Sequence, residues 1–172
     1  DKSDDFDQFA LSPKFGLVYQ PVLDKVSLFA NYQNSFMNVA PQTVMDVDGK
    51  NPRIKTFTPE HANQWEVGIK TNIIQNKLAF TASYYDIRVE NRVTPLADNI
   101  NDYDQRGKVR SRGVDIDIKA DATAGLTLIA GYSHNKIENM SSNKTDYYKE
   151  KGRAPGGQGP PDLANIWGTY TF

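Results

Sequence analysis

The sequence has no cysteine, only two histidines among its 172 residues, and a net charge of −1. The absence of cysteine excludes a disulfide framework and thiolate metal sites. No apolar run approaches the roughly 18 residues that a transmembrane helix needs, which excludes a helical membrane protein. The nearly neutral charge provides no basic surface, so no nucleic-acid partner is expected. Soluble β-proteins and membrane β-barrels remain, because alternating barrel strands keep the mean hydropathy low.

Seven segments in which apolar and polar residues alternate predict seven β-strands. They are residues 11–20, 26–33, 64–73, 78–89, 109–120, 126–133 and 163–172. The fifth segment alternates most regularly, with Val114, Ile116 and Ile118 on one face and Asp115 and Asp117 on the other. The segments are about eight to twelve residues long. This length suits tilted membrane-spanning strands better than the strands of about five or six residues that are usual in soluble proteins.

The connections between these segments alternate in length along the chain. Tight turns are expected at residues 20–25, 74–77 and 121–125, and long polar segments at 34–62, 91–108 and 134–162. An antiparallel meander then places every tight turn at one end of the sheet and every long segment at the other, as in transmembrane β-barrels. The sequence therefore predicts an all-β antiparallel meander over residues 1–172. Because seven strands do not close a bacterial barrel, which uses an even number, the meander is expected to form part of a larger barrel. A soluble β-sandwich that serves as a binding module is the alternative.

Aromatic residues on the apolar face gather near the ends of the predicted strands. Tyrosine and tryptophan combine an apolar ring with a polar tip, which suits them to a membrane–water interface. The membrane-interface residues predicted on this basis are Tyr32, Trp65, Tyr84 and Tyr132 beside the long segments, and Tyr19, Tyr170 and Phe172 at the tight-turn end.

Several segments resemble a known family. They are Leu-Ser-Pro-Lys-Phe-Gly-Leu-Val-Tyr at 11–19, Val-Ser-Leu-Phe-Ala-Asn-Tyr at 26–32, Gln-Trp-Glu-Val-Gly-Ile-Lys-Thr at 64–71, Ala-Ser-Tyr-Tyr-Asp-Ile at 82–87, Val-Arg-Ser-Arg-Gly-Val-Asp-Ile-Asp at 109–117 and Pro-Asp-Leu-Ala-Asn-Ile-Trp-Gly-Thr-Tyr at 161–170. In this order they resemble the barrel of TonB-dependent siderophore receptors. The resemblance implies a barrel of about 22 strands that is plugged by an N-terminal domain. This chain is then expected to be part of the second half of that barrel, with the plug and the final strands outside it.

The resemblance also implies a function. Receptors of this family capture a ferric siderophore outside the cell and import it across the bacterial outer membrane, using energy from the TonB complex, which contacts the N-terminal region. The expected partners are therefore the ferric siderophore, the TonB complex and outer-membrane lipid. The siderophore is the transported ligand, and no cofactor is expected to bind directly. Import of haem, a sugar or a vitamin on the same scaffold remains an alternative.

Arginine and aromatic side chains in and beside the long segments are the candidate ligand-binding residues. A cation neutralises an anionic chelate, and an aromatic side chain stacks on it or donates a hydrogen bond. The candidates are Phe36, Tyr85, Tyr103, Arg106, Arg110 and Arg112. Tyr103 and Arg106 are the first choices, because the flanking strands are expected to hold the segment that carries them.

Neither a metal site nor a catalytic site is predicted. Residues 46–51 begin like a calcium loop, but Gly49 is fourth in the loop and Phe57 is twelfth, where the EF-hand pattern needs glycine sixth and an acid twelfth. An Asp-Gly reverse turn is expected there instead. His61 and His134 have no second ligand at a metal spacing, and nothing in the sequence pairs either with a nucleophile. The protein is therefore not expected to be an enzyme.

Overall fold

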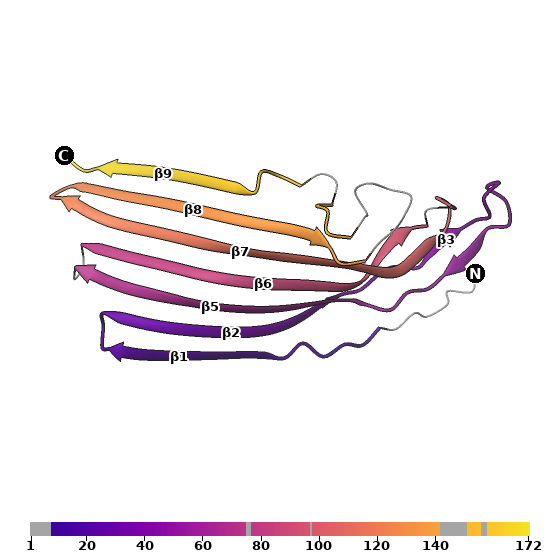
Figure 1. Cartoon of the computed structure of the whole chain (residues 1–172), viewed down its shortest axis with the longest axis horizontal. Helices are drawn as coiled ribbons and strands as arrows, with labels where there is room; N and C mark the ends of the chain where they lie inside the picture. Colours follow the sequence, from indigo (N-terminus) through magenta and orange to yellow (C-terminus); the bar gives the residue numbers. More distant parts are fainter. Residues whose placement is uncertain (1–7, 75–76, 97, 142–150, 156–157) are drawn as a thin grey trace.

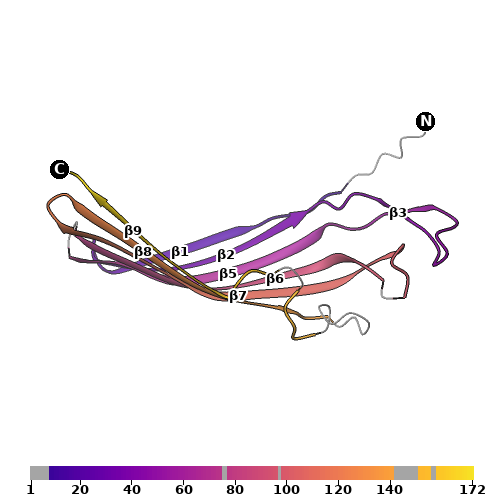
Figure 2. The ribbon, with the colours of Figure 1, turned by 90° about the horizontal axis from the view of Figure 1, so that it is seen from above.

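The computed structural model describes residues 8–74, 77–96, 98–141, 151–155 and 158–172. These residues form a seven-stranded antiparallel sheet and a separate two-stranded sheet. The large sheet is a single curved layer (Figures 1 and 2). In the part of the chain that is described, no helix is long and apolar enough to cross a membrane.

The strands of the large sheet lie in the order β1-β2-β5-β6-β7-β8-β9, and neighbouring strands pair antiparallel. Their bounds are β1 (Lys14–Val22), β2 (Val26–Met37), β5 (Glu60–Ile74), β6 (Leu78–Pro95), β7 (Tyr103–Thr123), β8 (Leu126–Asn139) and β9 (Asp162–Tyr170). β3 (Gln42–Val44) and β4 (Arg53–Lys55) form a hairpin between β2 and β5. This topology confirms the predicted meander of seven strands.

The strands extend beyond the predicted segments at the end of the sheet that carries the long connections. β6 reaches Pro95 and β7 begins at Tyr103, so most of the predicted loop 91–108 is β-structure. β2, β5 and β8 are also longer at this end than predicted. The prediction was wrong here because polar side chains occupy both faces, so the alternation that marks a strand disappears while the backbone pairing continues. Of the third long segment, residues 142–150 and 156–157 lie outside the described part of the chain.

The three short turns lie at the opposite end of the sheet (Figure 1). The Lys25 N–H donates to the Val22 carbonyl at 3.1 Å in the first turn, and the Lys77 N–H donates to the Ile74 carbonyl at 2.9 Å in the second. Residues 75–76 of the second turn lie outside the described residues. In the third turn Gly125 has a φ of 92°, a conformation that favours glycine. The predicted separation of short turns from long connections is confirmed.

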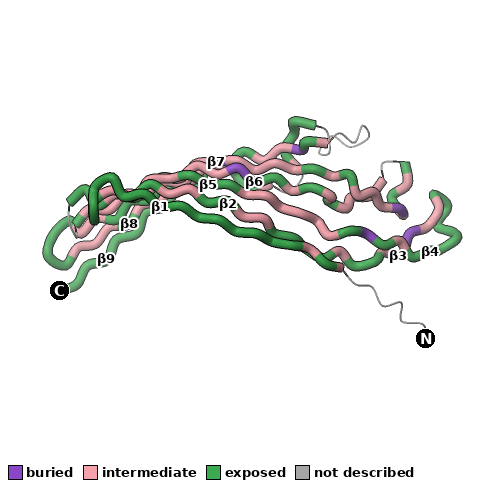
Figure 3. Tube along the Cα trace, turned by 90° about the horizontal axis from the view of Figure 1, so that it is seen from below, coloured by how far each residue is buried: buried purple, intermediate pink, exposed green. Residues whose placement is uncertain are grey.

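The cross-strand register divides the large sheet into an apolar face and a polar face. One row of partners on the apolar face is Leu17, Ala30, Val67, Tyr84 and Val114, and one row on the polar face is Gly16, Asn31, Glu66, Tyr85 and Gly113. Most of the chain is exposed or half-buried because the sheet is one layer thick (Figure 3). Among the described residues, the buried apolar side chains are Val44 and Phe57, in the connection between β2 and β5. The apolar face therefore has no described protein layer packed over it.

Candidate functional site

Aromatic residues border the apolar face on the side of the long connections. Tyr32 and Trp65 are cross-strand partners, and the ring centroids of Trp65 and Tyr84 lie 5.4 Å apart. Tyr132 also lies on this face. Successive cross-strand partners connect Tyr132 to Leu28 on β2, and Leu28 precedes Tyr32 by four residues. The border therefore runs obliquely across the strands, as it does when strands tilt in a membrane. That these residues contact a membrane interface stays a prediction.

Aromatic residues also lie on the apolar face towards the short turns. The rings of Tyr170 and Phe172 pack edge to face, with centroids 5.1 Å apart. Tyr170 pairs with Leu126, and Tyr19 pairs with Leu28. The role of these aromatic residues at a second interface also stays a prediction.

Two aromatic rings on the polar face lie over glycines of the neighbouring strand. A Cβ added at Gly68 would lie 2.3 Å from Cζ of Phe29. A Cβ added at Gly113 would lie 2.5 Å from the hydroxyl oxygen of Tyr85. Glycine at these two positions therefore lets the rings lie close against the sheet.

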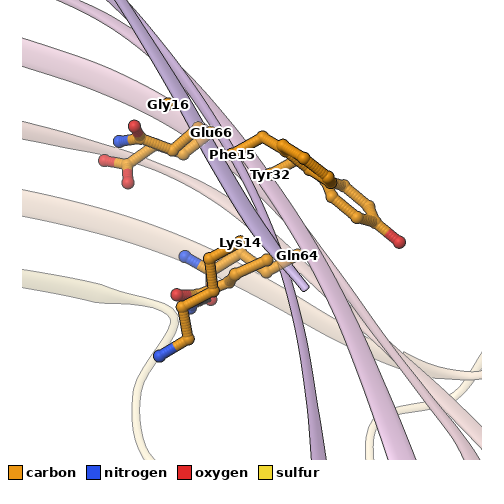
Figure 4. A pocket seen from close by; sticks show the side chains of 8 residues that line it. Lys14, Phe15, Gly16, Tyr32, Gln64 and Glu66 are labelled. Carbon is orange, nitrogen blue, oxygen red and sulfur yellow. Dashed lines mark hydrogen bonds between the residues drawn. The ribbon is translucent and has the colours of Figure 1, made fainter. Parts of the chain in front are cut away.

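A shallow hollow opens on the polar face over β1, β2 and β5. Lys14, Gln64 and Glu66 project to this side of the strands, whereas the ring of Tyr32 projects to the other (Figure 4). The Gln33 side-chain amide donates to Gln64 Oε1 at 3.0 Å. Because amides and one ion of each sign line the hollow, its charge selects neither anions nor cations.

The long connection between β2 and β5 folds against the connection between β6 and β7. The Met45 N–H donates to the Asn101 carbonyl at 2.9 Å, and the Asn99 side-chain amide donates to the Met45 carbonyl at 2.8 Å. We call this folded unit, residues 42–58 and 98–105, the loop lobe. The loop lobe joins two long polar segments, 34–62 and 91–108, which were predicted as separate loops.

Asp102 connects the two parts of the loop lobe. Its carboxylate accepts hydrogen bonds from Lys55 Nζ at 2.8 Å and from Arg53 Nη2 at 3.2 Å, both on β4. The Tyr103 N–H donates to the same carboxylate at 2.7 Å. These hydrogen bonds, with that of Lys55 foremost, hold the pKa of Asp102 below its usual value.

The segment that begins like a calcium loop is a reverse turn, as predicted. The Gly49 N–H donates to the Asp46 carbonyl at 2.9 Å, and Gly49 has a φ of 72°. The Asp46 carboxylate accepts hydrogen bonds from Asn51 Nδ2 at 2.7 Å and Arg53 Nη1 at 3.2 Å, and these lower its pKa. Within the described ranges, no three histidine, aspartate or glutamate side chains are grouped so that they could hold a metal ion.

The candidate ligand-binding residues do not come together in one place. Tyr103 and Arg106 lie at the loop lobe and the adjoining start of β7. Arg106 Nε lies 2.5 Å from Asp104 Oδ2, and the Arg106 side chain is 84% exposed. Tyr85 lies apart from them, on the polar face of the sheet.

The other three candidates lie on the opposite side of the sheet from Tyr85. Phe36 projects to the same side as Tyr32, four residues further along β2. Arg112 and Arg110 are two and four residues from Val114 along β7, so they project to the same side as the apolar face. The sequence already indicated this side, because both arginines are an even number of positions from Val114 and side chains alternate along a strand.

Asp86 is a buried charged residue that sequence reasoning missed. It projects to the same side of the sheet as Tyr84, two residues along β6, and it is fully buried. Arg110 Nε donates to its Oδ2 at 2.8 Å, and Arg88 Nε donates to its Oδ1 at 3.3 Å. The available signal was the run of charges at alternate positions 86, 88 and 90, directly after Tyr84.

A histidine–carboxylate contact joins β8 to the start of β9. His134 Nδ1 lies 2.8 Å from Asp162 Oδ1, and the Tyr132 hydroxyl donates to the same oxygen at 2.7 Å. His134 and Asp162 are cross-strand partners. The three side chains therefore fix the end of β9 that adjoins the third long connection.

The whole chain, residues 1–172, matches the protein family described as TonB dependent receptor-like, beta-barrel. The chain is 30% identical over 138 residues to the metal-pseudopaline receptor of Pseudomonas aeruginosa (strain UCBPP-PA14). The matched region covers 80% of this chain and 18% of that receptor. It is 27% identical over 147 residues to the ferrichrome outer membrane transporter/phage receptor of Escherichia coli (strain K12). The matched region covers 86% of this chain and 18% of that protein. The chain thus spans less than a fifth of the length of these two relatives.

Solved structures share the fold. The ferripyoverdine receptor of the outer membrane of Pseudomonas aeruginosa, bound to ferripyoverdine, is similar with a TM-score of 0.68 at 24% identity, covering 94% of this chain and 20% of that one. The ferric-catecholate import receptor Fiu from K12 E. coli is similar with a TM-score of 0.66 at 21% identity, covering 91% of this chain and 22% of that one. The family match over the whole chain, together with this fold, shows that the chain belongs to the TonB-dependent receptor family and forms part of the β-barrel of a bacterial outer-membrane receptor.

Proposed function

We propose that the complete receptor imports a ferric siderophore across the outer membrane with energy supplied through TonB. The observation that carries the proposal is the arrangement of the sheet, which has an apolar face, a polar face and a folded lobe at the end of the long connections. Relatives named for ferrichrome and ferripyoverdine support this class of cargo. Because the chain covers 18% of each of these relatives, the cargo and the coupling to TonB are proposals about the whole protein.

The loop lobe is proposed as part of the outer mouth that receives the siderophore. Tyr103 provides an aromatic ring at the lobe, and Arg106 provides an exposed cation close to it. This combination suits an anionic chelate, since the cation neutralises charge and the ring stacks or donates a hydrogen bond. Tyr85 remains a candidate for contact on the polar face. We leave Phe36, Arg110 and Arg112 out of the proposed mouth, because they lie on the opposite side of the sheet from Tyr85.

The metal is proposed to stay inside its chelator during recognition. The sequence has no cysteine, and the described residues include no group of side chains suited to a metal ion. Recognition would then depend on the organic shell and net charge of the chelate rather than on direct ligation.

A chelate whose metal is not restricted to iron is the second candidate cargo. The observation in its favour is the 30% identity to a receptor named for metal-pseudopaline. A binding experiment that compares one chelator loaded with different metals separates the two candidates.

The test uses the complete receptor that carries this sequence. Tyr103→Ala together with Arg106→Ala is expected to weaken binding of the cognate ferric siderophore at least tenfold, measured by fluorescence quenching against a panel of hydroxamate, catecholate and mixed chelates. Lys25→Ala is the matched control, because Lys25 is an exposed cation in a short turn at the other end of the sheet. Loss of affinity in the control, or unchanged affinity in the double variant, would contradict the role of the two residues.

Coupling to TonB is tested separately in cells. Deletion of TonB is expected to abolish uptake of the radiolabelled chelate while surface binding persists. Uptake that continues without TonB would contradict the proposed energy source. Binding of haem or of sugars in place of metal chelates would contradict the cargo.

A further inference from the structure

The two faces of the sheet exchange their character beyond the aromatic border on β6, β7 and β8. In the middle of these strands the face that meets lipid in a barrel is apolar, and the inner face is polar. Beyond the border the charged side chains lie on the outer face, where Asp86 pairs with Arg112 and Arg112 pairs with Lys136. The inner face at this level carries isoleucine and valine. An apolar surface therefore faces the interior of the barrel near the long connections.

Four apolar side chains form this surface, which we call the inner apolar patch: Ile87, Val89, Val109 and Ile137. Ile87 and Ile137 are both cross-strand partners of Ser111, so they flank it in one row. Val89 pairs with Val109 in the next row towards the long connections. None of these four apolar residues is fully buried. Direct and diagonal partners on one face of a sheet lie close enough to present one surface, so the patch is continuous across the three strands.

The inner face around the patch is free of charge on the described parts of β6, β7 and β8. Its positions from the Tyr85 row outwards are Tyr85, Ile87 and Val89 on β6, Gly113, Ser111 and Val109 on β7, and Asn135, Ile137 and Asn139 on β8. Deeper in the barrel the inner face becomes polar, with Asp115 and Asp117 on β7. A water-filled interior favours polar side chains at every level, so it does not explain an apolar patch confined to the outer end.

The patch continues into the proposed outer mouth. β6 runs on from Val89 to Pro95, which pairs with Tyr103 at the loop lobe. A contiguous apolar surface that faces water indicates a binding partner. A neutral apolar surface attracts hydrocarbon and aromatic groups, because their contact removes apolar area from water on both sides. It offers no ion pair to a charged group.

We propose that the inner apolar patch binds the hydrocarbon or aryl part of the chelate that the receptor imports, an inference that rests on the proposed function. Arg106, near the loop lobe, neutralises the charge of the metal-binding groups, whereas the patch contacts the segments that join these groups. The cargo class is then an amphipathic chelate with a hydrocarbon or aryl framework, rather than a chelate built on a sugar or on a highly charged peptide.

The test uses the complete receptor and two matched pairs of synthetic ferric chelates, one pair with hydroxamate groups and one with catecholate groups. Within a pair, one chelate has methylene spacers, and the other has ether-interrupted spacers of equal length. The metal-binding groups and the net charge are the same. The natural receptor is expected to bind the methylene-spaced member of at least one pair about tenfold more tightly, as measured by fluorescence quenching.

The variant carries threonine at all four positions of the inner apolar patch. Threonine keeps the β-branch of isoleucine and valine, so the strands retain a suitable side-chain shape while the patch becomes polar. The variant is expected to bind the two members of each pair equally. The matched control is Val18→Thr together with Ile129→Thr, because both residues lie on the inner face but away from the patch. This control is expected to retain the preference for methylene spacers.

The outcomes separate this inference from the proposed function. If the natural receptor binds no ferric chelate, the proposed function fails and this inference fails with it. Equal binding of the two members by the natural receptor, or an unchanged preference in the threonine variant, would overturn this inference alone. An equal fall in affinity for both members would also overturn it, since another part of the receptor would then cover the patch. If the fourfold variant does not fold, Ile87→Thr is compared with Ile129→Thr, and equal preferences would be equally decisive.

Discussion

The Asp86 carboxylate is fully buried between two arginines, with Arg110 Nε 2.8 Å from its Oδ2. Arg110 also donates from Nη2 to the same oxygen. In the register, Asp86 pairs with Arg112 and Arg110 pairs with Arg88, so the contact runs diagonally between β6 and β7. A diagonal ion pair fixes the relative register of the two strands at the level where the apolar face ends.

Asp86→Ala is expected to lower the free energy of unfolding of the complete receptor by about 1–3 kcal/mol, because it removes charge-assisted hydrogen bonds from a buried position. The measurement is urea-induced unfolding in phosphatidylcholine vesicles. Asp104→Ala is the control, since its partner Arg106 is 84% exposed and ion pairs with a solvated partner contribute about 0–1 kcal/mol. A double-mutant cycle with Arg110→Gln should show coupling between Asp86 and Arg110, and additive effects of the two substitutions would contradict the ion pair.

The strands could be predicted because, in the middle of each strand, the side chains on one face of the sheet are apolar. The register of Ile116 with Ala82 and Tyr132, and of Asp117 with Thr81 and Gly131, follows the alternation that the sequence shows. Beyond the aromatic border both faces are polar, so nothing in the hydrophobic pattern distinguishes a paired strand from a loop. This is why β6 and β7 were predicted too short.

The loop lobe could not be predicted, because its contacts join residues that are far apart in the sequence. Asp102 and Arg53 are separated by 49 positions, and no local pattern specifies their pairing. The side of the sheet on which Arg110 and Arg112 lie was predictable, because both are an even number of positions from the apolar residue Val114. The two arginines were predicted to bind ligand from their residue type and their position along the chain. The side of the sheet to which they project was not considered.

The loop lobe is expected to loosen in acid. The pKa of Asp102 lies below its usual value of 3.8, chiefly because Lys55 donates a hydrogen bond to the ionised carboxylate. Since the folded-state pKa is lowered, this stabilisation is complete above pH 3.8 and is lost as the pH falls through the lowered pKa. Asp46, whose pKa is lowered by Asn51 and Arg53, contributes with the same sign.

Amide hydrogen exchange over residues 42–58 and 98–105 of the complete receptor, corrected for the intrinsic effect of pH, measures this change. Protection is expected to be constant between pH 7 and pH 5 and to decline below pH 3.8. Asp102→Asn should accelerate exchange already at pH 7, while exchange in the middle of β7 stays constant. Equal protection of the lobe in Asp102→Asn and in the natural receptor would show that this carboxylate does not hold the two connections together.

Ile118→Arg is expected to destabilise the receptor far more than Asp117→Arg. Ile118 lies on the apolar face between Phe80 and Ala130, two residues nearer the short turns than Ile116, the partner of Tyr132 in the aromatic border. An arginine on the lipid side of a barrel near the middle of the bilayer costs about 2–4 kcal/mol. Asp117 is the adjacent residue on the same strand and lies on the polar face between Thr81 and Gly131, where an arginine can stay in water. The free energy of unfolding in vesicles of both variants measures the difference. Because the two positions share strand, depth and new side chain, equal losses would mean that the face with Ile118 does not contact lipid.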